Sequence, residues 1–139
     1  MNKIFSILLI FLLLPVTADS STIKTGEDLL YSCKRAISYN NGAKLMLRDQ
    51  VRMFSCLSYV NGFFDGWQAK ETTISTSDEL SKQDKKNIQK VKNFCLSGKT
   101  IMQLVRVIVR ALEKNPKILN YKSNLLVTWI LTKSFPCKK

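Results

Sequence analysis

Apolar residues recur at steps of three and four in several stretches of the chain, which is the spacing of one buried helix face. The first stretch follows Thr25, a suitable N-cap residue with Asp28 at the third helical position. The second begins near Arg48 or Asp49 and carries an apolar stripe about four turns long, made of Met53, Cys56, Leu57, Val60, Phe63, Phe64 and Trp67. The pattern predicts two helices separated by a turn at Asn40-Asn41-Gly42.

Two dipeptides within the second stretch are compatible with two different structures. Asn61-Gly62 and Asp65-Gly66 are typical of hairpin turns. Glycines four residues apart on a helix also let another backbone approach closely. We favour the helix, with the glycine pair packing against another part of the same chain. A seam between two copies of the chain, and therefore a homodimer, is the alternative.

The sequence of the C-terminal half predicts two more helices. Thr100 and Gln103 form a capping box before residues 101–114, which end at Asn115-Pro116 because proline disfavours helical geometry in the residue before it. The last helix is expected over 122–134, and we expect four of its residues to face inward: Leu125, Leu126, Trp129 and Ile130.

The segment between these halves has a weaker pattern. Residues 71–81 are polar and rich in Ser and Thr, which predicts a surface loop. Residues 82–94 are basic with a thin apolar register, which predicts at most a short, exposed helix. The expected fold class is therefore all-α, a compact bundle of about five helices.

The N-terminus has the pattern of a secretory signal peptide. Lys3 precedes an apolar run from Ile4 to Val16, and Ala18 provides a small residue before a cleavage site. The run of 13 residues is shorter than the roughly 20 needed to span a bilayer. We expect residues 1–18 to be a signal peptide and 19–139 to be the mature, periplasmic domain, without stable membrane insertion.

The four cysteines suggest two disulfides in an exported chain. Cys33 and Cys56 lie on the apolar faces of the first two helices, so a bond between them would join an antiparallel pair. Cys95 precedes the 101–114 helix and Cys137 follows the last helix, so a second bond would close that end. We predict the pairs Cys33–Cys56 and Cys95–Cys137.

Composition excludes several kinds of chemistry. The chain has 22 Lys+Arg, 10 Asp+Glu and no His, giving a formal charge of +12. Without His, Ser-His-Asp triads, Cys-His pairs and His-containing zinc sites are impossible. No C-x2-C spacing supports a thiolate metal site, so we expect no metal and no cofactor. The candidate acids of a lysozyme-like enzyme, Glu27 and Glu113, lie at helix ends, so we expect no catalytic activity.

Several short segments, taken in order, resemble one known family. They are Gly26-Glu27-Asp28-Leu29-Leu30 before Cys33, Cys56 to Gly62 with Asp65, Phe94-Cys95-Leu96 before Thr100, Gln103-Leu104, Leu112 with Asn115-Pro116, and Phe135-Pro136-Cys137. The set resembles the Rap/Tai family of resistance-associated, type VI secretion immunity proteins. The resemblance implies a periplasmic helical protein that binds a secreted cell-wall amidase toxin and blocks its active site.

The residues themselves favour a protein-binding module, because export, small size and disulfides come without a catalytic set. The best contact candidates are the polar loop 71–81 and a basic segment with the lysines Lys82, Lys85, Lys86, Lys90 and Lys92. A solvated helix face is the simpler interpretation of these lysines. Two other functions stay open: an envelope protein that binds anionic lipid or lipopolysaccharide, and a periplasmic acid-stress chaperone of the HdeA type.

The positive charge is concentrated in the second half of the chain. Residues 19–81 carry seven basic and eight acidic groups, whereas residues 82–139 carry fourteen basic and two acidic groups. Nucleic acid would suit a cytoplasmic protein of this charge, but export argues against it. The sequence therefore predicts an exported helical binder whose C-terminal half contacts an acidic partner.

Overall fold

A computed structural model describes residues 22–76 and 94–137 of the chain. Within these residues it contains four α-helices and a short 3-10 helix, and no β-strand. The helices are α2 (Gly26–Asn40), α3 (Leu47–Thr76), α5 (Ile101–Lys114) and α6 (Ser123–Ser134), with η1 (Pro116–Ile118) between the last two. The all-α prediction is confirmed. The proposed signal peptide lies outside the described residues.

Helix α2 begins where the sequence predicts. The Thr25 hydroxyl accepts a hydrogen bond from the backbone N–H of Asp28, and the Asp28 carboxylate accepts one from the backbone of Thr25. Burial raises the pKa of Asp28, but the hydrogen bonds from Thr25 and Lys24 outweigh it, so the pKa lies below its ordinary value. After the helix, Gly42 has a φ of +89°, a left-handed conformation that favours glycine.

Helix α3 is longer than expected. It runs to Thr76, so residues 71–76, predicted as part of a loop, are helical. Once a helix is nucleated, each further residue adds a hydrogen bond, so a polar sequence need not end it. The Asn61 amide donates to the Asp65 carboxylate at 2.7 Å within the helix, where a hairpin turn was the alternative. The helix interpretation of the two dipeptides is therefore confirmed.

The glycine pair does not pack against the rest of the described chain. A Cβ atom built on Gly62 or Gly66 would meet nothing within 4 Å among the described residues. Packing of the glycine pair against another part of the chain is therefore not seen among the described residues and stays a prediction. The physical reason is which face of α3 points inward: the rings of Phe63 and Trp67 stack on the buried Phe94, and the two glycines lie on the exposed side of the helix.

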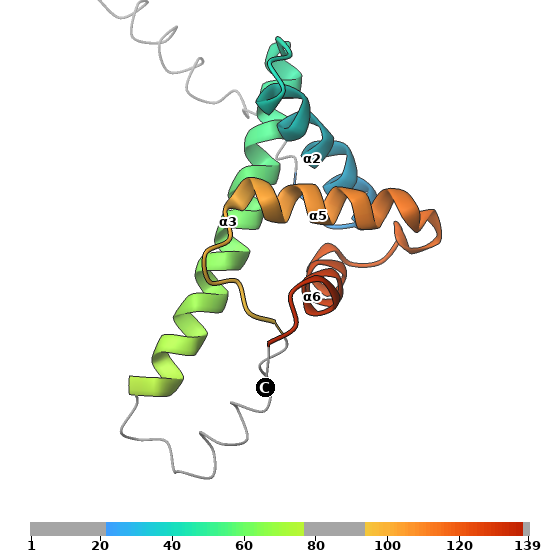
Figure 1. The fold of residues 1–139 in the computed structure, drawn as a ribbon. Helices are drawn as coiled ribbons and strands as arrows, with labels where there is room; N and C mark the ends of the chain where they lie inside the picture. The colour runs from blue at the N-terminus through green and yellow to red at the C-terminus, as the bar shows by residue number, and fades with distance from the viewer. Residues whose placement is uncertain (1–21, 77–93, 138–139) are drawn as a thin grey trace, which may run out of the picture.

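Helix α5 is the centre of the fold. It packs against α2, α3 and α6 (Figure 1), and its buried residues are Leu104, Val105, Ile108, Val109 and Leu112. Thr100 and Gln103 form the predicted capping box, and the helix ends at Lys114 before Asn115 and Pro116. The exposed residues of α5 are all polar, so the helix has one apolar and one polar face: Gln103, Arg106, Arg110, Glu113 and Lys114.

Helix α6 is rotated by about one residue from the expected orientation. Leu126 and Ile130 are buried as predicted, together with Val127 and Leu131. Leu125 and Trp129, also predicted to face inward, are 61% and 40% exposed. Two neighbouring stripes of α6 are apolar, so hydrophobicity alone does not determine which of them packs inward. The Tyr59 hydroxyl donates to Ser123 Oγ at 2.9 Å and helps place the start of α6 against α3.

Two disulfides join the helices. Cys33 on α2 is bonded to Cys56 on α3, and Cys95 before α5 is bonded to Cys137 after α6. These are the pairs expected from the order of the helices. Next to the second disulfide, Phe94 is fully buried and stacks on the Trp67 ring with 4.1 Å between ring centroids. The connection before α5 is thus held against α3 by an aromatic contact.

Candidate partner-binding surface

The five candidate contact lysines, Lys82, Lys85, Lys86, Lys90 and Lys92, lie outside the described residues. The surface that the structure does describe offers three other features: a polar network between α2 and α3, an apolar stripe on α3, and two adjoining hollows beside α6. Within the described ranges no three His, Cys, Asp or Glu side chains are grouped so that they could hold a metal ion. The described helices include none that is long and apolar enough to cross a membrane.

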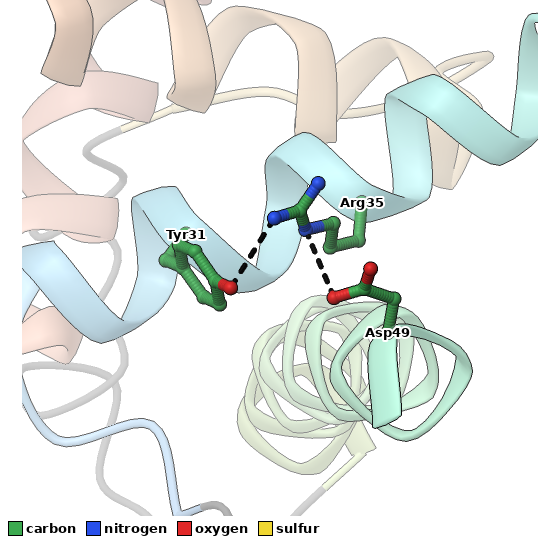
Figure 2. A network of polar contacts seen from close by, with 3 residues as sticks. All are labelled: Tyr31, Arg35 and Asp49. Atoms are coloured by element: carbon green, nitrogen blue, oxygen red, sulfur yellow. Dashed lines mark hydrogen bonds and ion pairs between the residues drawn. The ribbon is translucent and has the colours of Figure 1, made fainter. Parts of the chain in front are cut away.

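A polar network connects α2 to the start of α3. Figure 2 shows Tyr31 and Arg35 on α2 with Asp49 of α3 beside them. Arg35 Nη2 donates to the Tyr31 hydroxyl at 3.2 Å, and Arg35 Nε lies 3.2 Å from Asp49 Oδ1. The second contact is an ion pair without hydrogen-bond geometry. The Arg52 guanidinium also lies 4.3 Å from the centre of the Tyr31 ring.

The electrostatics of this network follow from its two arginines. The hydrogen bond from Arg35, and then its charge, lower the pKa of Tyr31 below the ordinary value. The same hydrogen bond raises the pKa of Arg35. Asp49 is engaged by Arg35, so no carboxylate in the network is free to act as a general base for the Tyr31 hydroxyl. The arrangement is suited to joining the two helices, not to bond cleavage.

Helix α3 carries an unusually exposed apolar stripe near its start. Leu47, Val51 and Phe54 lie at steps of four and three and are 77%, 48% and 59% exposed. The preceding residue, Met46, is exposed as well. Single exposed apolar residues are ordinary, but a contiguous stripe of this kind often marks a contact with another molecule.

The third feature consists of two hollows that share Trp129. One has a volume of about 350 Å³ and is lined by Ile118, Tyr121, Leu125, Leu126 and Trp129. The other, of about 510 Å³, lies between α5 and α6, where it is lined by Arg110, Lys114 and Lys133 as well as Trp129. We call the two hollows together the Trp129 surface. One hollow is apolar and the other basic, so the surface matches a ligand with both characters.

The charges of the Trp129 surface are not neutralised by the rest of the described chain. No acidic residue lines either hollow. Glu113, the acidic residue of α5, lies 2.8 Å from Lys34 of α2 and is paired there. Lys133 Nζ lies 4.4 Å from the centre of the Trp129 ring, a cation–π contact with an exposed aromatic group. This surface was missed from the sequence, although Arg110 and Lys114 stand four residues apart on one helix face.

The described fold consists of helices joined by disulfides, with exposed apolar and basic surfaces and no grouped metal ligands. Three comparisons with known proteins were informative to different degrees. No curated protein and no solved structure matches the chain. A family model of the Rap1a immunity proteins matches residues 25–137, from the N-cap of α2 to the last cysteine, and the chain therefore belongs to the Rap1a immunity protein family.

Proposed function

We propose that the protein is a periplasmic immunity protein that binds a type VI secreted peptidoglycan amidase and occludes its active site. Membership of the Rap1a immunity family carries this proposal. The two disulfides support it, because disulfides form and persist in oxidising compartments such as the periplasm. An inhibitor of this kind acts by binding alone, which agrees with the exposed surfaces described above and requires no catalytic group.

Export is part of the proposal. Residues 1–18 would be the signal peptide and 19–139 the mature domain, so the amidase and its inhibitor would meet in the periplasm. N-terminal sequencing of the protein recovered from the periplasm tests this directly. A first residue at Asp19 agrees with cleavage after Ala18, and a retained Met1 contradicts it.

Co-expression provides the test of immunity. Cells that direct a type VI peptidoglycan amidase to the periplasm should lyse, and the full chain should restore growth against its cognate amidase. The matched control is the same chain without residues 1–18, which should not protect because it stays away from the amidase. Purified mature domain should also reduce cleavage of isolated peptidoglycan. Failure to protect against a broad panel of such amidases, with normal periplasmic levels of the protein, would count against the amidase target.

We also propose that the mature domain forms a homodimer through the outer face of α3. The exposed stripe of Leu47, Val51 and Phe54 continues at helical steps to Ser58 and Gly62. One exposed face of α3 therefore carries large apolar residues near the start of the helix and small residues further along it. A second copy could cover it at close range, since Gly62 has no side chain. Light scattering should give a dimer mass for the mature domain and a monomer mass for Phe54→Glu. A monomeric parent protein would contradict the proposal.

A further inference from the structure

We propose that the Trp129 surface binds an acidic segment of a protein partner that also carries an apolar side chain. Arg110, Lys114 and Lys133 would bind the carboxylates, and the hollow beside Trp129 would receive the apolar side chain. If the immunity function proposed above holds, this partner is the effector, and the surface is then the basic contact that the C-terminal half of the chain contributes.

The placement of the cations is the first argument. Arg110 and Lys114 are exposed, stand one turn apart on α5 and line the same hollow as Lys133 of α6. Like charges four residues apart destabilise a helix slightly, so the fold gains nothing from bringing them together. Lys114 and Lys133 lie in the last turns of their helices, where the helix dipole favours a cation. That effect does not account for Arg110, and no described acid neutralises the group.

The exposed aromatic residues are the second argument. Tyr121 is 61% exposed and Trp129 40% exposed, and both line the apolar hollow. Its volume of about 350 Å³ falls at the lower end of the range for ligand pockets. Trp, Tyr and Arg are the residue types that most often dominate the energy of protein interfaces. Here all three types meet at one surface, with Trp129 lining both hollows.

The shape of the surface favours a protein segment over a lipid bilayer. A helix that lies in a membrane interface exposes an apolar face along its whole length. On α6 only Leu125 and Trp129 are exposed large apolar residues, while Leu126, Val127, Ile130 and Leu131 are buried in the core. A pair of hollows, one basic and one apolar, is better matched by neighbouring acidic and apolar side chains of a polypeptide.

The experiment uses random peptides displayed on phage and selected against the mature domain, so that it does not depend on knowing the effector. We expect the enriched peptides to combine acidic residues with a Leu, Phe or Trp. A synthetic peptide from the selection should bind about tenfold more weakly to Trp129→Ala and to the double variant Arg110→Glu/Lys114→Glu, with a marked dependence on salt. The controls are Arg106→Glu, one turn earlier on α5, and Tyr39→Ala, an exposed aromatic residue of α2. Neither lines the surface, so both should bind the peptide normally.

Two further arms separate the explanations. Phosphatidylglycerol vesicles should not compete with the peptide; vesicle binding lost in Trp129→Ala and in Arg110→Glu/Lys114→Glu would overturn the proposal in favour of a lipid. An absence of acidic peptides, or equal binding by the variants, would also overturn it.

Any amidase that the protein neutralises is then tested with the same variants and with Lys85→Glu/Lys86→Glu. If only the last variant loses affinity, the lysine segment and not the Trp129 surface is the contact. Failure to neutralise any amidase, with peptide binding intact, would reject the immunity proposal alone.

Discussion

Replacing both Cys33 and Cys56 by Ala should destabilise the mature domain by about 4 kcal/mol, a loss of roughly 10–20 °C in melting temperature. The bond joins two residues that are 23 positions apart in the sequence. Its restriction of the unfolded chain alone accounts for about 3 kcal/mol of stability. Both cysteines are fully buried between α2 and α3, so their removal also leaves poorly packed space in the core. Thermal unfolding followed by circular dichroism measures the change.

The second disulfide provides a matched control. Cys95→Ala/Cys137→Ala removes a bond between residues that are 42 positions apart in the sequence. For this longer loop, chain entropy alone predicts the larger loss of stability, about 4 kcal/mol. We nevertheless expect a smaller loss of about 2 kcal/mol, because Cys95 is exposed and Cys137 half-buried. The tail after α6 can then detach locally while the core stays folded. If the Cys95–Cys137 variant proves the less stable of the two, loop entropy and not core packing determines the effect.

The sequence was sufficient for the features that depend on local chemistry. Thr25 with Asp28 and Thr100 with Gln103 each combine an N-cap residue with a side chain that returns to the cap, so both helix starts were predictable. The pairing of the cysteines followed from their positions on or beside the helices. These features depend on residues within one or two turns of each other, or on the simple order of neighbouring helices.

The orientation of α6 and the length of α3 could not be predicted in the same way. On α6 two adjacent stripes are apolar. Contact with the other helices, mainly α5 and α2, determines that Val127 and Leu131 pack inward while Trp129 stays exposed. On α3 the polar residues 71–76 carry no residue that would begin or end a helix. They are helical because they continue the helix formed by the residues before them, which their own composition does not reveal. The same limitation hid the Trp129 surface, which combines α5, η1 and α6 and exists only after the helices pack.

A side chain at Gly26 should cost the domain stability, whereas one at Gly62 should not. Gly26 is buried at the first position of α2, where a Cβ atom would lie 2.5 Å from Leu126 Cδ1 and 3.0 Å from the backbone oxygen of Leu119. The Leu126 side chain can rotate away. The Leu119 oxygen cannot move freely, because it accepts a hydrogen bond from the Glu27 N–H at 3.0 Å. We expect Gly26→Ala to lose about 2 kcal/mol through this overpacking.

Gly62→Ala should have the opposite sign, a gain of about 0.5–1 kcal/mol, since alanine loses less backbone entropy in a helix and nothing described lies within 4 Å of the new methyl group. Both substitutions are best compared in the Phe54→Glu background, so that any dimer seam at Gly62 does not contribute. Urea unfolding should then show midpoints shifted in opposite directions with unchanged slopes. If Gly26→Ala leaves the stability unchanged, the close contact between the start of α2 and the backbone at Leu119 does not stabilise the fold. If Gly62→Ala is destabilising as a monomer, the outer face of α3 is covered by part of the same chain.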